Sequence, residues 1–187
     1  MGTLARNFNQ NLTLSERLKK RRAVIENALI LDTSGSMCEM CDEKTTKIEA
    51  LMSIVKNLNC KHIYAFSSYA RKLADNKELL TAAGSTNLSP ALNLLKADNQ
   101  HSAIIITDGD ITDKDLTMEF IDANPEIKLQ IIYVGPIDSK PAFLEQLANK
   151  TGGFCTVESL ASNLLEEKIR LLLNPADEGK DSGSIQL

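Results

Sequence analysis

A short run of oxygen-bearing side chains follows an apolar stretch near the start of the chain, and its chemistry suits a hard cation. The run is Asp32-Thr33-Ser34-Gly35-Ser36, directly after residues 28–31, which read Ala-Leu-Ile-Leu. Gly35 allows a tight turn, so that the Asp32 carboxylate and the Ser34 and Ser36 hydroxyls can point into one small volume. Mg²⁺ prefers such oxygen ligands and is often held by one or two carboxylates plus neutral oxygens. The run therefore predicts part of a divalent-cation site.

Two later segments add donors of the same kind. Thr86 lies in Gly84-Ser85-Thr86-Asn87, which leads toward a predicted helix. Asp108 follows Thr107, directly after the apolar run at residues 104–106. With D-x-S-x-S at Asp32, this order of motifs resembles the von Willebrand factor type A (vWA) family and its metal-ion-dependent adhesion site. The resemblance spans roughly residues 23–173, since Gly152-Gly153-Phe154 also looks like the family. It implies metal ligands, some acting through water, at Asp32, Ser34, Ser36, Thr86 and Asp108.

The resemblance implies a protein-binding module that is not an enzyme. Two carboxylates formally neutralise a divalent cation, and hydroxyls add no further charge, so the ion stays attractive to an Asp or Glu of a partner protein. We expect Mg²⁺, with Mn²⁺ or Ca²⁺ as alternatives. By family analogy the chain is an adaptor in an intracellular assembly, with an AAA-type ATPase or another assembly subunit as partner. The sequence identifies neither the partner, the process nor the oligomeric state.

Two other functions remain as alternatives. A Mg²⁺-dependent phosphohydrolase of haloacid-dehalogenase-like type would use Asp32 as nucleophile, but such enzymes carry a second Asp two positions later, where this chain has Ser34. A ribonucleoprotein-associated vWA protein would use the basic cluster at residues 17–22. The net charge of −4 and the pI near 5.3 argue against a general nucleic-acid binder.

Alternating apolar runs and helical spacing predict the fold class. Strands are predicted at residues 28–31, 60–66, 101–107, 129–134 and 154–157, and helices near 48–58, 88–96, after Thr112, after Ser139 and at 160–173. Thr112 and Ser139 are predicted helix caps, and Leu160, Leu164, Leu165, Ile169 and Leu172 are expected to face inward from the last helix. This alternation predicts an α/β, Rossmann-like, doubly wound, mostly parallel sheet with helices on both faces. The family resemblance adds one antiparallel edge strand at 69–73 and places the strands before Asp32 and Asp108 side by side.

The domain organisation follows from composition. Residues 1–22 are expected to form a basic arm or short helix that Thr13 caps, 23–173 the vWA-like domain and 174–187 a disordered tail rich in Gly, Ser and acidic residues. The first ten residues lack the apolar core of a signal peptide, and no apolar run approaches the roughly 18 residues of a membrane helix. We therefore expect a cytoplasmic protein that does not bind membranes.

The cysteines allow a different metal site. Cys38-x-x-Cys41 is half of a zinc pattern, and Cys60 and His62 are a candidate second half. Cys60 and His62 begin a strand, so they are expected at the opposite end of the sheet from Cys38 and Cys41. The leading interpretation is that Cys38 and Cys41 lie at the rim of the sheet by coincidence and share no role. A labile disulfide or an intermolecular metal site is the alternative. Cys155, within a predicted strand, is expected to be a small buried hydrophobe.

Overall fold

The computed structural model describes residues 27–58, 60–160 and 163–173. The predictions for the arm at 1–22, including its Thr13 cap, and for the tail at 174–187 lie outside the described residues.

Six strands form one sheet in the order β3-β2-β1-β4-β5-β6. Their bounds are β1 Ala28–Asp32, β2 Ile63–Phe66, β3 Ala70–Lys72, β4 Ser102–Thr107, β5 Lys128–Tyr133 and β6 Cys155–Val157. Strand β3 is antiparallel to β2 at one edge, and the other neighbours are parallel. The predicted fold class, an α/β Rossmann-like sheet with one antiparallel edge strand, is confirmed.

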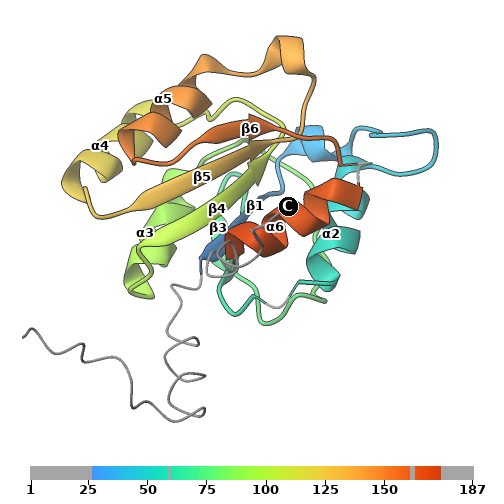
Figure 1. Cartoon of the computed structure of the whole chain (residues 1–187), viewed down its shortest axis with the longest axis horizontal. Helices are drawn as coiled ribbons and strands as arrows, with labels where there is room; N and C mark the ends of the chain where they lie inside the picture. Colours follow the sequence, from blue (N-terminus) through green and yellow to red (C-terminus); the bar gives the residue numbers. More distant parts are fainter. Residues whose placement is uncertain (1–26, 59, 161–162, 174–187) are drawn as a thin grey trace, which may run out of the picture.

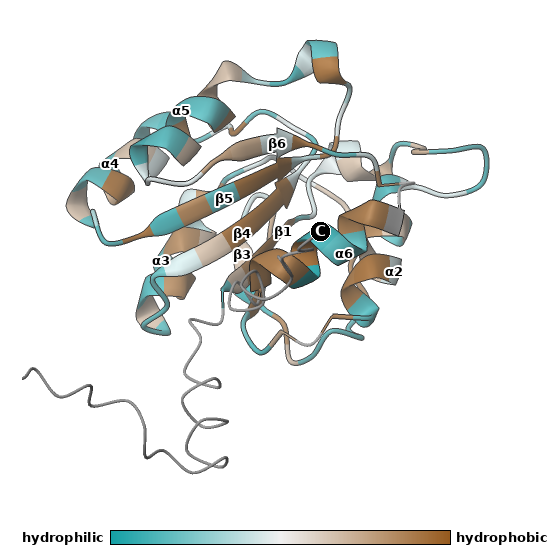
Figure 2. Cartoon of the chain, viewed as in Figure 1, coloured by the Kyte–Doolittle hydropathy of each residue, from teal (hydrophilic) through white to brown (hydrophobic). Residues whose placement is uncertain are grey.

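The helices cover both faces of this sheet (Figure 1). Their bounds are α2 Lys47–Lys56, α3 Ser89–Ala97, α4 Lys114–Ala123, α5 Ala142–Lys150 and α6 Asn163–Leu173, and two short 3-10 helices are η1 Gly35–Cys38 and η2 Ile137–Ser139. Helices α2 and α6 share one apolar core with one face of the sheet, and α3, α4 and α5 share another with the opposite face. In Figure 2 most of β4 and the later part of β5 have the brown of hydrophobic residues, whereas the start of β4 is pale and the first half of β5 is partly teal.

Strand β1 explains why the sheet needs both layers of helices. Its residues are all buried, with Leu29 and Leu31 in the core under α2 and α6, and Ala28 and Ile30 in the core under α3 to α5. Side chains alternate between the faces of a strand, so an unbroken apolar run is stable only where both faces are covered.

Two predicted helix caps are wrong. Helix α4 has Asp113 as its N-cap, and Thr112 instead accepts a hydrogen bond at its Oγ1 from the Thr86 backbone N–H (3.3 Å). The Asp113 carboxylate accepts hydrogen bonds from the backbone N–H groups of Leu88 and Ser89, at 2.8 and 2.9 Å. It thereby ties the start of α4 to the start of α3, a contact that local sequence cannot reveal. Ser139 ends η2, and Pro141 is the N-cap of α5.

The predicted inward face of the last helix is partly wrong. Leu165 and Ile169 of α6 are buried as expected, and Leu172 is partly buried and packs against the same core, but Leu164 is 69% exposed. Leu164 neighbours Leu165 in sequence, so it lies about 100° around the helix from the buried stripe. Leu160 is buried but precedes the helix.

The Gly-Gly pair before β6 has a steric cause. A β carbon on Gly153 would lie 2.0 Å from the backbone oxygen of Leu129, so only glycine lets the chain pass β5 this closely.

None of the helices among the described residues combines the length and apolarity needed to cross a membrane.

Candidate functional site

The ends of β1 and β4 bring the two predicted aspartates together. These strands are parallel neighbours in a register that pairs Leu31 with Ile106, so Asp32 and Asp108 follow at the same edge of the sheet. Strand β2 lies on the other side of β1, and the chain reaches β4 only after β2 and β3. The strand order therefore reverses at β1, and open α/β sheets bind ligands beyond the carboxyl ends of strands at such a point.

Serine hydroxyls bridge the space between the two carboxylates. Ser36 donates a hydrogen bond from its Oγ to Asp108 Oδ1 (2.7 Å), and the Oγ atoms of Ser34 and Ser36 lie 3.1 Å apart. The Ser34 backbone N–H donates to Asp32 Oδ1 (2.7 Å). The D-x-S-x-S turn thus continues β1 into η1 in a form that gathers four of the five predicted site residues.

The segment before α3 brings in Thr86. Gly84 has a φ of +85°, and its backbone oxygen accepts a hydrogen bond from the Gly35 N–H (3.0 Å), which fixes this segment against the D-x-S-x-S turn. A β carbon placed on Gly109 would lie 3.7 Å from Thr86 Oγ1 and 3.8 Å from Ser36 Oγ. Both hydroxyls therefore face the same glycine beside Asp108, and the structure brings all five predicted residues to one place.

Asp32 is a fully buried charge of the cluster. Its side chain has no exposed surface, and Thr107 donates a hydrogen bond to its Oδ2 (2.5 Å). Burial raises the pKa of Asp32, and hydrogen bonds from Thr107 and Ser34 offset only part of this effect. Without a cation this buried carboxylate is destabilising when ionised, a property common in functional sites.

Lys47 is a member of this cluster that the sequence interpretation missed. Its ammonium lies 2.6 Å from Asp108 Oδ2 and 2.6 Å from Glu39 Oε2, and its side chain is 11% exposed. Burial alone would lower the pKa of Lys47, but the hydrogen bonds to Asp108 and Glu39 outweigh burial and raise that pKa. The group is therefore a permanent positive charge beside the Asp108 carboxylate.

A signal for Lys47 was present in the sequence. Thr46 caps α2 in a reciprocal arrangement with Glu49, so Lys47 is the first helical residue. A cation is unfavourable at a helix N-terminus, and Lys47 lies on the same helix face as the buried Leu51. A lysine at an unfavourable place on an apolar face indicates a buried partner, here a carboxylate 61 residues away.

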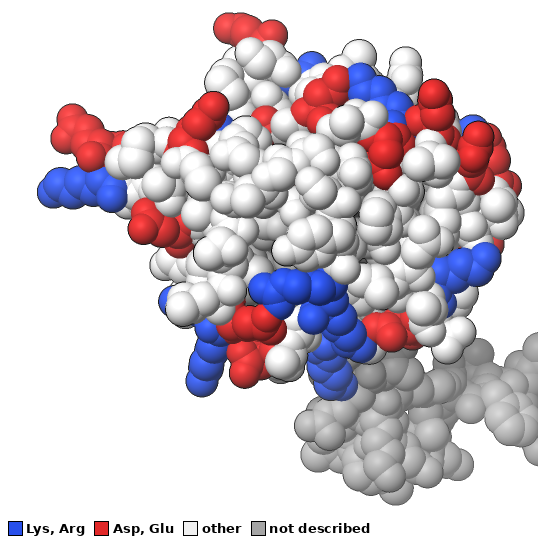
Figure 3. Space-filling view, turned by 180° about the vertical axis from the view of Figure 1, so that it is seen from behind, with Lys and Arg blue, Asp and Glu red and all other residues white. Residues whose placement is uncertain are grey.

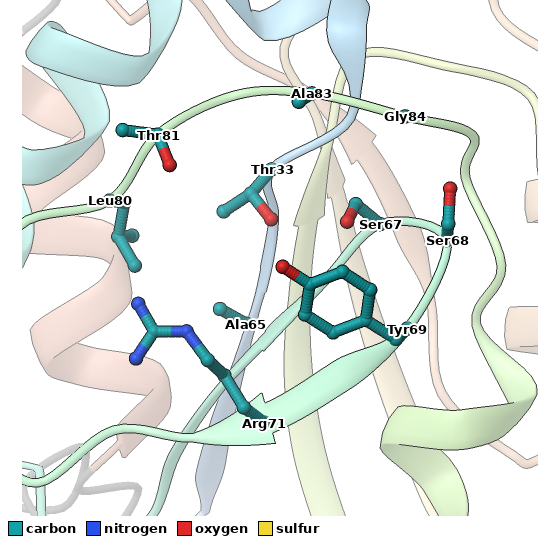
Figure 4. Close-up of a pocket in the computed structure, with 10 residues that line it drawn as sticks. All are labelled: Thr33, Ala65, Ser67, Ser68, Tyr69, Arg71, Leu80, Thr81, Ala83 and Gly84. Carbon is teal, nitrogen blue, oxygen red and sulfur yellow. The ribbon is translucent and has the colours of Figure 1, made fainter.

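A small pocket adjoins the cluster (Figure 4). It has a volume of about 160 Å³ and lies among the end of β1, the β2–β3 turn and the segment 80–84. The side chains of Thr33, Tyr69 and Arg71 point into it. Thr33 follows Asp32, and its backbone oxygen accepts a hydrogen bond from the Ala83 N–H (2.8 Å), which holds the segment 80–84 against the end of β1.

Other candidate groups lie apart from the cluster or have ordinary roles. Cys60 and His62 precede β2, at the end of the sheet opposite Cys38 and Cys41, which follow β1, so a zinc site from these four residues is excluded. Cys155 is only partly buried, contrary to expectation. Exposed Asp110, in the loop before α4, pairs with Lys114, the first residue of that helix. On the face that Figure 3 shows, basic side chains lie among acidic ones.

The donor set fits a hard divalent cation. Two carboxylates and three hydroxyls are oxygen ligands of the kind that Mg²⁺ takes, with water completing the shell. The described residues contain no group of three or more His, Cys, Asp or Glu side chains that could hold a metal, so any such ion depends on the hydroxyls and water. This chain matches no protein-family model and no curated protein.

Proposed function

We propose that this chain is a vWA-like protein-binding module in which Asp32, Ser34, Ser36, Thr86 and Asp108 hold a divalent cation that takes an acidic side chain from a partner. One observation carries the proposal. The two aspartates meet at the point where the strand order reverses, and a serine hydroxyl from one segment hydrogen-bonds the carboxylate of the other. The ligand set of the resembled family supports the same interpretation.

The charges at the site favour an incoming anion. Asp32 and Asp108 contribute two buried negative charges, and the Lys47 ammonium lies between Asp108 and the exposed Glu39. Mg²⁺, Mn²⁺ or Ca²⁺ would bring two positive charges that formally offset both buried carboxylates, with coordination positions left that water or a partner carboxylate can fill. Hydroxyl donors maintain that positive charge because they bring dipoles without further negative charge.

Exposed apolar side chains around the site support a protein as the partner. Met40, Tyr69 and Ile137 are 53%, 69% and 70% exposed. They lie in the segments that follow β1, β2 and β5, whose carboxyl ends share one edge of the sheet. Apolar and aromatic side chains around a polar centre are typical of protein interfaces.

The experiment is affinity capture from the source cell with and without chelator, combined with calorimetric Mg²⁺ titration. Thr86→Asp adds a negative charge to the site, so the variant should still bind Mg²⁺ but lose the partner that wild type captures in a chelator-sensitive manner. Asn93→Asp adds the same charge on the exposed side of α3 and serves as the control. Partner capture by Thr86→Asp at the wild-type level, or wild-type capture that chelator leaves unchanged, would refute the proposal.

Catalysis is not part of this proposal. Ser34, whose side chain lies against Ser36, occupies the position at which a haloacid-dehalogenase-like enzyme carries its general acid. We expect no turnover of an aryl phosphate with Mg²⁺, and a turnover that Asp32→Asn abolishes would favour the phosphohydrolase.

A further inference from the structure

Both oxygens of the Asp108 carboxylate already have hydrogen-bond donors from the protein. Ser36 donates to Oδ1 and the Lys47 ammonium to Oδ2, at 2.7 and 2.6 Å. The serine hydroxyl has lone pairs and can remain beside a cation as a ligand, whereas a charged ammonium has none. A divalent ion at Asp108 and the ammonium of Lys47 are therefore competitors for one carboxylate.

Lys47 has a second carboxylate within the same hydrogen-bonding distance. Glu39 Oε2 lies 2.6 Å from the ammonium, and the Glu39 side chain is 68% exposed, whereas that of Asp108 has no exposed surface. The Lys47 backbone N–H donates to the Glu39 backbone oxygen (2.9 Å), which holds the loop after η1 against the start of α2. The ammonium thus lies between a buried carboxylate and a solvent-exposed one.

We propose that Lys47 is a tethered competitor of the divalent cation. Its ammonium pairs with both Asp108 and Glu39 in the metal-free protein, and it leaves Asp108 and pairs with Glu39 only when the cation binds. The inference rests on the proposed metal site and adds the determinant of its affinity. Two cations at one carboxylate repel each other, and the effective dielectric constant is low at a buried site. Lys47 therefore weakens cation binding, and Glu39 reduces that penalty by accepting the displaced ammonium.

The experiment measures Mg²⁺ and Mn²⁺ dissociation constants by calorimetry for wild type and four variants. Lys47→Met keeps the length of the stem and removes the charge, whereas Lys47→Arg keeps the charge. Glu39→Gln removes the negative charge of the second acceptor at an exposed position, so it tests the idea even if a Lys47 variant folds poorly. The Lys47→Met/Glu39→Gln double variant completes a cycle that isolates their interaction. Thermal melting by circular dichroism reports on folding.

We expect Lys47→Met to bind the cation about ten-fold or more tightly, within the range of roughly 5- to 150-fold that coupled sites show. Lys47→Arg should bind no more tightly than wild type, because guanidinium holds a carboxylate firmly. Glu39→Gln should weaken binding about five-fold in the Lys47 background, at the lower end of that range of couplings, and should have no effect in the Lys47→Met background.

The outcomes separate this inference from the proposed metal site. Equal affinities of wild type and Lys47→Met would overturn the competition and leave the metal site standing. A Glu39→Gln effect of the same size in both backgrounds would overturn the transfer to Glu39. If Lys47→Met bound the cation and wild type did not, the Lys47 ammonium would exclude the cation from Asp108 completely, which would support the competition. If neither wild type nor Lys47→Met bound Mg²⁺ or Mn²⁺, the metal site and this inference would be overturned together.

Discussion

Asp32→Asn gives the sharpest test of a cation at the end of β1. Asparagine keeps the size of the side chain and an oxygen for the Ser34 N–H, but it removes the negative charge. A cation at about one hundred times its dissociation constant contributes roughly 2.7 kcal/mol to folding. In a chain of 187 residues, each 1 kcal/mol moves Tm by about 2–4 °C, so Mg²⁺ should raise the wild-type Tm by about 5–10 °C. Asp32→Asn should lose nearly all of that gain.

The same variant should behave in the opposite way without metal. Burial raises the pKa of Asp32, so the folded protein favours the protonated carboxyl group. The stability that this protonated group contributes is present below the ordinary carboxyl pKa of 3.8 and is lost as the pH rises through the raised pKa. At pH 7 in chelator, Asp32→Asn should therefore melt at or above wild type.

Thermal melting with Mg²⁺ and with chelator measures both effects. Asp110→Asn is the matched control, because this exposed aspartate follows Asp108 by two residues and pairs with Lys114. Its gain from Mg²⁺ should equal that of wild type. If Asp32→Asn gained as much from Mg²⁺ as wild type does, the ion would lie elsewhere and the reasoning would be refuted.

Three further variants test the supporting structure. Thr107→Val removes the hydroxyl that donates to buried Asp32, so urea unfolding in chelator at pH 7 should show a loss of about 1.5–3 kcal/mol, and no loss would contradict this role. Asp98→Asn should destabilise the protein by about 1 kcal/mol or less at pH 7, because hydrogen bonds from Lys72 and from a tyrosine of β2 lower the pKa of Asp98. That stability is present above pH 3.8 and is lost as the pH falls through the lowered pKa, so the two proteins should converge in acid unfolding curves. Gly153→Ala places a β carbon 2.0 Å from a backbone oxygen of β5, and a Tm within 1 °C of wild type would contradict the close approach.

The sequence was most informative where a local pattern has one structural meaning. The apolar run before Asp32 is buried on both faces, as an unbroken run in a parallel sheet must be. The five predicted donors converge because each lies in a segment that follows a strand or precedes a helix. Patterns with several meanings are less informative: Thr112 and Ser139 are not helix caps and Leu164 does not face inward, because capping and helix phase depend on where the helix begins.

The sequence by itself therefore predicted the alternation of strands and helices, and the family resemblance added the antiparallel edge strand and the five oxygen-bearing side chains that the fold brings together. Only the tertiary structure decided which charges face one another. The contact of Lys47 with Asp108 and that of Thr107 with Asp32 depend on strand register and on the placement of α2, and both join residues more than 60 positions apart. The physical reason is that periodicity and turn residues act over a few neighbouring positions, whereas the energy of a buried charge depends on whatever the fold brings within a few ångströms.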